Sequence, residues 1–236
     1  MISFLRDIFH RFEAVTLASL VIIAGAIWAF GALASEMIEG DLEAFDRTIL
    51  VALRNPADLS DPIGPRAVEV MMRDLTALGG ITVLSILTVS VILFLALKGN
   101  RRSAGIVAVA IAGGQGLSHL SKMLFSRPRP DLVPHGVEVA TASFPSGHSM
   151  MAAVTYLTLA VMLARVEPRP KIKVLYVALA VCLTAAVGCS RVYLGVHWPS
   201  DVLAGWAAGA GWALAWLMLA SWLASKGEIE PDRKAA

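Results

Sequence analysis

The chain has 236 residues and a mass of 25.0 kDa; 57% of its residues are hydrophobic, only 16% are charged, and its mean hydropathy is +0.69. This composition excludes an intrinsically disordered chain, and two cysteines are too few for a disulfide-stapled scaffold. A net charge of +2 is too small to indicate a nucleic-acid partner.

Six stretches without Asp, Glu, Lys or Arg are long enough to approach the roughly 20 apolar residues that a membrane-spanning helix needs. They are apolar on every face, whereas the strands of an outer-membrane barrel alternate apolar and polar residues. We therefore expect an all-α polytopic membrane protein, with residues 1–236 as one domain of six transmembrane helices. The helices are expected at about 14–34, 75–97, 103–121, 147–164, 174–190 and 202–223.

The first apolar run follows Arg6 and Arg11 and ends in Ala-Leu-Ala, which resembles a signal-peptidase site. Because the run is longer than the 7–15 residues of a signal-peptide core, we expect it to be retained as an uncleaved helix. The next segment, residues 36–74, contains Pro56, Pro62 and Pro65. Two interpretations of this segment remain open: it lies along the membrane surface, or it is a solvated connector.

The distribution of Lys and Arg predicts the orientation, because cytoplasmic loops are enriched in these residues. With the N-terminus in the cytoplasm, twelve of the twenty basic residues fall in cytoplasmic segments. We expect both termini in the cytoplasm of a bacterial cell, the chain in the inner membrane, and the longer polar loops on the periplasmic or extracellular side. Gly205 and Gly209 form a G-x-x-x-G pattern, which we assign to packing within the bundle rather than to dimerisation.

Three polar clusters lie at the ends of the predicted helices, where ionisable groups near lipid are costly and indicate a function. They occupy residues 122–130 (KMLFSRPRP), 145–148 (PSGH) and 190–201 (SRVYLGVHWPSD). The third and fifth helices run outward and the fourth and sixth run inward in the expected topology. All three clusters therefore reach the same outer face and can form one site.

The cations of this site indicate an anionic ligand. Lys122, Arg129 and Arg191 bring three positive charges together, with Arg127 as a candidate fourth. Arginine offers a planar fork that matches phosphate oxygens, and the start of the helix after Ser146 offers backbone N–H groups. The alternative for each cation taken alone is snorkelling to the lipid headgroups.

Two histidines add reactive groups to the cations. Asp201 follows His197 by four positions, so its carboxylate can accept the Nδ1 proton and leave Nε2 free to attack, while His148 can act as an acid or base. A zinc site is the rival interpretation, because two histidines and an aspartate are metal ligands. We expect metal independence and no cofactor, because the fixed cations disfavour a divalent ion and already neutralise a phosphate.

The combination K-x6-R-P, P-S-G-H and S-R-x5-H-x3-D resembles the type 2 phosphatidic acid phosphatase superfamily, and the three clusters contain it without a departure. The resemblance implies a phosphatase that acts through a phosphohistidine. His197 would be the nucleophile, Asp201 its orienting carboxylate and His148 the general acid. The residues that would bind the phosphate oxygens are Lys122, Arg129, Ser146, Gly147 and Arg191.

The resulting expectation is an integral membrane lipid phosphatase whose site opens at the outer membrane–water interface. Its partners would be membrane lipids and a lipid phosphate or diphosphate, with no nucleic acid and no required protein partner. The candidate substrates are undecaprenyl diphosphate, which is our first choice, phosphatidic acid, phosphatidylglycerol phosphate and a lipid A-like glycolipid. Two alternatives are a non-catalytic lipid-phosphate binder or transporter, and a relative of the vanadium-dependent haloperoxidases, whose motifs are similar.

Overall fold

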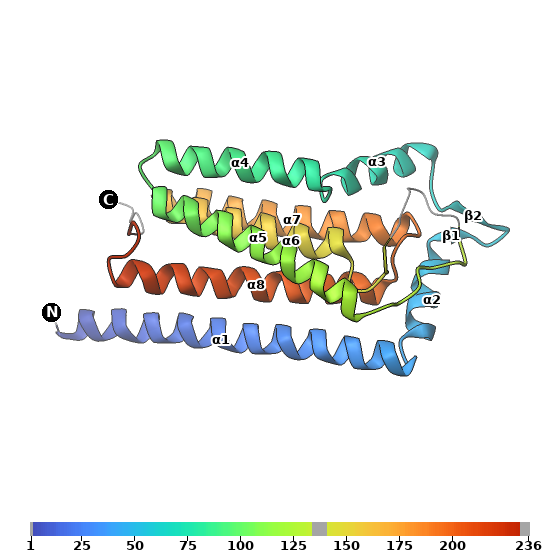
Figure 1. Cartoon of the computed structure of the whole chain (residues 1–236), viewed down its shortest axis with the longest axis horizontal. Coiled ribbons are helices and arrows are strands. Elements are labelled where there is room, and N and C mark those ends of the chain that lie inside the picture. Colours follow the sequence, from blue (N-terminus) through green and yellow to red (C-terminus); the bar gives the residue numbers. More distant parts are fainter. Residues whose placement is uncertain (1, 134–140, 232–236) are drawn as a thin grey trace.

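The computed structural model describes residues 2–133 and 141–231, with residues 2–15 described by their backbone alone, and this part of the chain is a helical bundle with one two-stranded sheet (Figure 1). The elements are α1 (Ile2–Glu39), α2 (Glu43–Ala52), β1 (Arg54–Asn55), β2 (Asp58–Pro62), α3 (Arg66–Ala77), α4 (Ile81–Leu97), α5 (Arg101–Leu124), α6 (Gly147–Val166), α7 (Pro170–Tyr193) and α8 (Pro199–Ser225). Each of the six predicted helices has a counterpart, so the all-α class is confirmed.

Five of the described helices are long and apolar enough to cross a membrane: α1, α5, α6, α7 and α8. Helix α4 has 17 residues and is about 25 Å long, which is short of a hydrocarbon core of about 30 Å. It forms a sixth span only together with α3, from which it is bent by 50°. The described residues therefore contain five candidate spans, or six if the bent pair counts as one.

The prediction of one continuous helix over residues 75–97 is wrong, because the chain breaks between α3 and α4. Gly79 lies at this break, and a Cβ there would come within 2.4 Å of Val187 Cγ1 on α7. The glycine lets the bend pack closely against α7. The sequence pattern does not reveal this break, because the residues before and after Gly79 are all apolar or small.

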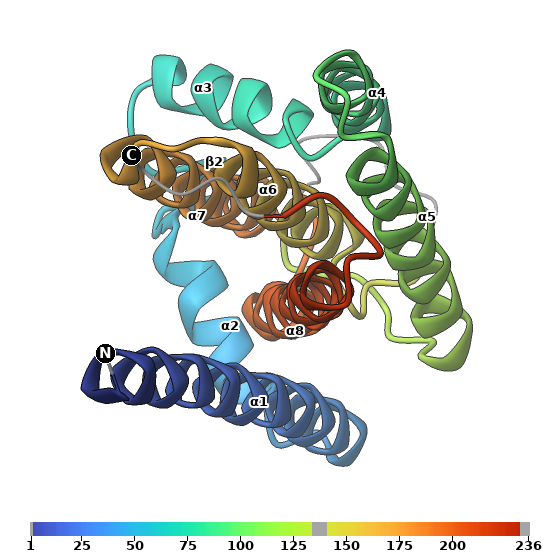
Figure 2. The same ribbon diagram turned by 90° about the vertical axis from the view of Figure 1, so that its left-hand side faces the viewer.

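Helix α6 lies at the centre of the bundle and packs against α5, α7 and α8 (Figure 2). Helix α1 packs on the outer side of α8, and α4 packs on α5. Successive helices from α4 to α8 run in opposite directions, and α1 begins at the same end of the bundle at which α8 ends (Figure 1). Helices α5 and α7 therefore end where α6 and α8 begin.

The G-x-x-x-G pattern of α8 serves the packing of the bundle, as predicted. A Cβ on Gly205 would come within 2.8 Å of the carbonyl oxygen of Ser146, and one on Gly209 within 2.6 Å of the carbonyl oxygen of Met150. The absence of these side chains lets α8 approach the backbone of α6. This contact sets the distance between the first turns of the two helices.

The segment between α1 and α4 covers one end of the bundle (Figure 1). Helix α2 packs on α8 and buries Asp46 and Leu50, the antiparallel pair β1–β2 follows, and α3 packs on α7. Buried Arg54 in β1 donates from Nη2 to the carbonyl oxygen of Tyr193 at 2.7 Å, which ties the sheet to the end of α7. The segment is therefore a folded cover rather than a solvated connector.

Candidate active site

The three polar clusters of the sequence meet at the end of the bundle that this cover encloses. Lys122 lies in the last turn of α5 and Arg191 in the last turn of α7. His148 lies in the first turn of α6, and Asp201 lies in the first turn of α8. The alternating helix directions bring the clusters to one end, as the sequence predicts.

His197 lies just before α8 and is only 1% exposed. Its Nδ1 is 3.4 Å from Asp201 Oδ2 and 3.3 Å from the hydroxyl of Ser143, and its Nε2 is 3.2 Å from Arg129 Nη1. A guanidinium can only donate, so Nε2 must be the acceptor and the ring proton must sit on Nδ1. This tautomer presents the lone pair of Nε2 to the cations of the site.

Asp201 is fully buried and is held by several donors. Its Oδ2 accepts the backbone N–H of Trp198 at 2.9 Å, which caps the start of α8, and it also accepts the hydroxyl of Ser143. Its Oδ1 accepts from Arg127 Nη1 at 2.7 Å. The carboxylate therefore has a fixed orientation toward His197.

Two of the predicted phosphate-binding cations are held by one short stretch of backbone before α6. Lys122 Nζ donates to the carbonyl oxygen of Ala142 at 2.8 Å, and Arg129 Nε donates to the carbonyl oxygen of Thr141 at 2.8 Å. Arg129 Nη1 also donates to the carbonyl oxygen of Val196 at 2.6 Å. Burial lowers the pKa of Arg129, and Asp201 opposes that shift. These carbonyl oxygens give the cations polar partners without a counter-charge.

Arg191 is 3% exposed and has one side-chain partner, the hydroxyl of Thr76 on α3, at 2.8 Å from Nη1. Its Nε is buried and has no hydrogen-bond partner within the described residues. A buried donor without a partner is costly, so this N–H favours an anionic ligand at the site.

The first turn of α6 contributes Ser146, Gly147 and His148. The hydroxyl of Ser146 accepts the backbone N–H of Ser149 at 3.4 Å and caps the helix, and the N–H of Ser146 donates to the carbonyl oxygen of Asp201 at 3.0 Å. Gly147 lies against Lys122, because a Cβ at this position would be 3.0 Å from Lys122 Cε. His148 lies within electrostatic range of His197 and of the Lys122, Arg129 and Arg191 cations. All the predicted site residues are thus brought together.

A groove of about 550 Å³ extends from these residues between α4, α5 and α6. Lys122, Gly147 and His148 line one end of the groove. The rest is lined by apolar side chains such as Ile81 and Leu84, interspersed with polar ones such as Thr88 and Gln115. The groove therefore has one end with a cation and a histidine, and a longer part that is mostly apolar.

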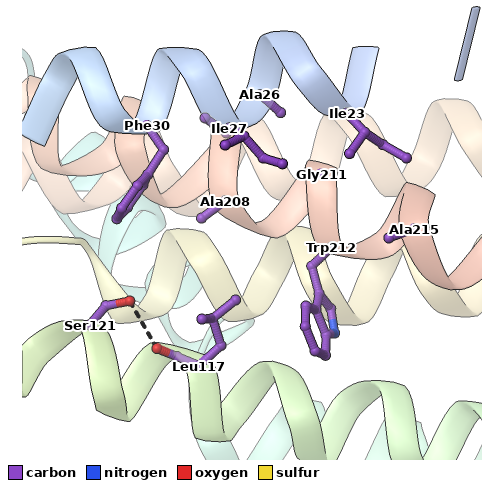
Figure 3. A pocket seen from close by; sticks show the side chains of 11 residues that line it. Ile23, Ala26, Ile27, Phe30, Leu117, Ser121, Ala208, Gly211, Trp212 and Ala215 are labelled. Carbon is purple, nitrogen blue, oxygen red and sulfur yellow. Dashed lines mark hydrogen bonds between the residues drawn. The ribbon is translucent and has the colours of Figure 1, made fainter. Parts of the chain in front are cut away.

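A second cavity of about 240 Å³ lies between α1, α5 and α8 and has no comparable chemistry (Figure 3). Its two polar side chains are already engaged: Ser121 donates to the carbonyl oxygen of Leu117 at 2.9 Å, and Trp212 Nε1 donates to that of Ala110 at 2.8 Å. The other lining residues are apolar. The candidate active site therefore lies at the end of the first groove, which Lys122 and His148 line.

The structure gives one candidate residue unexpected partners, and it adds three residues that the sequence interpretation did not name. Arg127, the candidate fourth phosphate cation, is instead paired with Asp46 and Asp201 at 2.7 Å each. Asp46, Thr76 and Ser143 lie outside the three motifs, and no short-range pattern marks them. Only the pairing with the partly buried Arg127 reveals Asp46.

The chain is similar to several known proteins. The sequence model of the PAP2 superfamily matches residues 103–225, which include all three clusters. Phosphatidylglycerophosphatase B of Bacillus subtilis is 43% identical over 94 residues, which are 39% of this chain and 46% of that protein. The lipid A 1-phosphatase of Rhizobium johnstonii is 35% identical over 107 residues, which are 42% of this chain and 40% of that protein. The chain thus spans less than half the length of these curated relatives.

The fold is also similar to a solved structure, described as the first transmembrane PAP2 type phosphatidylglycerolphosphate phosphatase from Bacillus subtilis. The likeness has a TM-score of 0.68 at 25% identity and covers 86% of this chain and 95% of that one. Exposed apolar side chains such as Trp28 on α1 and Ile86 on α4 fit a lipid surround. The chain is an integral membrane protein.

The protonation of His197 predicts a pH dependence of stability. Burial lowers the pKa of His197 to about 4, although Asp201 raises it, and Arg129 and Arg191 lower it further. In the unfolded chain the pKa is near 6.5, so as the pH falls below 6.5 the unfolded chain gains a proton that the folded chain does not. The loss should reach about 2 kcal/mol at pH 5 and should be absent above pH 7.

The measurement is the Tm in detergent between pH 7.5 and pH 5, for the wild type and for His197→Gln. The fall in Tm should be smaller in His197→Gln. His119→Gln, which changes an exposed histidine of α5, serves as the matched control. An equal fall in the wild type and in His197→Gln would contradict the prediction.

Proposed function

The chain belongs to the PAP2 superfamily, and from this premise we propose that it is a lipid phosphatase that hydrolyses a phosphate monoester or diphosphate of a lipid. The observation that carries the proposal is His197, whose Nε2 faces Arg129 while Nδ1 faces Asp201. Near it lies the buried Arg191, whose Nε has no partner among the residues that the structure describes. A non-catalytic binder or transporter of lipid phosphates needs the cations but has no use for an oriented His197–Asp201 pair. A haloperoxidase-like role is disfavoured by the five apolar spans.

In the proposed mechanism, Nε2 of His197 attacks phosphorus and the bond from phosphorus to the leaving oxygen breaks. His148 gives a proton to that oxygen and then takes one from the water that hydrolyses the phosphohistidine. Asp201 keeps the ring proton on Nδ1 and stabilises the positive charge that the ring acquires. The second step releases inorganic phosphate and restores His197.

We assign the phosphate oxygens to the side chains of Lys122, Arg129 and Arg191 and to Ser146 and Gly147 at the start of α6. The first turn of α6 lies close to Lys122, since a Cβ at Gly147 would be 3.0 Å from Lys122 Cε. Three cations neutralise the charge that a metal ion would otherwise neutralise, so the mechanism uses no metal and no cofactor.

The apolar part of the groove between α4, α5 and α6 would hold the lipid tail, with the phosphate at the end formed by Lys122 and His148. The two curated relatives are named for phosphatidylglycerophosphate and lipid A, which share a phosphate on a lipid anchor. These two and undecaprenyl diphosphate, together with phosphatidic acid, form the substrate set of the proposal.

The central test is release of inorganic phosphate from these four lipids by the purified protein in detergent. We expect turnover in the presence of EDTA and inhibition by vanadate, which resembles the five-coordinate transition state. His197→Ala should be inactive on every lipid. Activity that is lost in EDTA and restored by magnesium or zinc would overturn the metal-free mechanism, and no turnover by the wild type would overturn the proposed activity.

We propose that the site faces the periplasm or the cell exterior and that both termini lie in the cytoplasm of a bacterial cell, with the chain in the inner membrane. The count of Lys and Arg supports this orientation. A cysteine at Ala57, in the hairpin over the site, should then react with a membrane-impermeant thiol reagent added to intact cells. A cysteine at Lys98, in the turn at the other end, should not react. Cys182 and Cys189 are first replaced by serine, and reversed labelling would place the site in the cytoplasm.

The acid role of His148 predicts a dependence on the leaving group. General acid catalysis contributes about 10²–10⁴-fold, and it matters most when the departing oxygen is strongly basic. His148→Ala should therefore lose much more rate on phosphatidic acid, which expels an alkoxide, than on an aryl phosphate. Equal losses on the two substrates would assign His148 to phosphate binding instead.

A further inference from the structure

A row of buried charges connects α2 to the side of Asp201 opposite His197. Arg127 Nη1 donates to Asp201 Oδ1 at 2.7 Å, and Arg127 Nη2 donates to Asp46 Oδ2 at 2.7 Å. Ser200 completes the row, because its N–H donates to Asp46 Oδ1 at 2.8 Å and its hydroxyl lies 2.8 Å from Arg127 Nη1. Both carboxylates are fully buried, and the arginine side chain is 11% exposed.

We propose that Asp46 and Arg127 are positioning residues for the nucleophile: they act on His197 through Asp201 and take no part in holding phosphate. The inference rests on the proposed function, because it concerns the same histidine. Both terminal nitrogens of Arg127 donate to carboxylates of the protein, so the guanidinium has no terminal nitrogen left for a phosphate. This distinguishes Arg127 from Arg191, which has a buried donor without a partner in the described part of the chain.

Arg127 has a geometric role, because it fixes one oxygen of Asp201. With Oδ1 bound by Arg127 and Oδ2 bound by Trp198 N–H and Ser143, the carboxylate cannot turn away from His197 Nδ1. The Nδ1···Oδ2 distance of 3.4 Å is long, so small rotations of the carboxylate would break the contact. Lysine could keep the charge of Arg127 but has a single nitrogen, which cannot bridge two carboxylates in this geometry.

Asp46 has an electrostatic role. Arg127 alone would cancel the negative charge of Asp201 at the moment when His197 becomes positively charged. Asp46 balances Arg127, so the row of three groups keeps one net negative charge beside the imidazole. Buried charges are expensive unless they are paired, and Asp46 is paired with Arg127 at 2.7 Å.

The test is a double-mutant cycle that uses Asp46→Asn, Arg127→Gln and Asp201→Asn. In the wild-type background we expect Asp46→Asn and Arg127→Gln each to lower kcat on an aryl phosphate by 10- to 100-fold, with KM changed by less than threefold. In the Asp201→Asn background, the same changes should lower kcat by less than threefold, because the carboxylate through which they act is gone. Single-turnover measurements over hours extend the assay to these slow variants.

Arg165→Gln is the matched control. Arg165 is also a buried arginine, but it lies at the opposite end of the bundle, where it contacts Ser221 and the backbone of Glu230. This variant is expected to lower Tm and to leave kcat within threefold. It thus measures what the loss of a buried arginine does by itself.

Three outcomes separate the alternatives. If Arg127→Gln and Asp46→Asn cost as much in the Asp201→Asn background as in the wild type, they only anchor α2 and the inference is wrong. A rise in KM with unchanged kcat would instead make Arg127 a phosphate ligand, which also overturns it. If Arg127→Gln does not fold, the nearly isosteric Asp46→Asn carries the same cycle alone. No phosphate release by the wild type would count against the proposed function rather than against the row of charges.

Discussion

The buried carboxylate of Asp201 is the interaction on which the arrangement of the site depends. It caps the first turn of α8 through the N–H of Trp198, contacts His197 and pairs with Arg127. Its backbone carbonyl also accepts the N–H of Ser146, so it fixes the start of α6 as well. One fully buried charge thus sets the position of two helix starts and of the imidazole between them, because a carboxylate in this environment tolerates no missing donor.

The close approach of α6 and α8 makes this arrangement possible. Gly205 lies against the backbone of Ser146 and Gly209 against that of Met150, so the two helix starts lie within reach of one another. Side chains at either glycine would push α8 outward, and with it His197. The cover formed by α2, the hairpin and α3 closes the same end, and Thr76 and Asp46 reach the site from it. A membrane bundle without this cover would leave Arg191 without Thr76 and Arg127 without Asp46.

Much of the fold could be predicted from the sequence, because the length of an apolar run is a local property. A run of about 20 apolar residues matches the thickness of a bilayer and so predicts a membrane-spanning helix. The alternation of helix directions followed from the expected membrane topology, and it placed the three motifs at one end. The break at Gly79 could not be predicted, because residues on both sides of it are apolar and the bend depends on how α7 packs there. The folded cover could not be predicted either, because its elements are short and are stabilised by contacts with α7 and α8.

The sequence by itself determined which residues could form the site: the two histidines, Asp201 and the cations stand in motifs with fixed local spacing. Only the tertiary structure decided what each cation touches. Arg127 and Arg129 are two positions apart in the sequence, yet the first faces Asp46 and Asp201 and the second faces His197. The physical reason is distance along the chain: the partners of Arg127 lie 81 and 74 residues away, so their pairing exists only after the helices have packed.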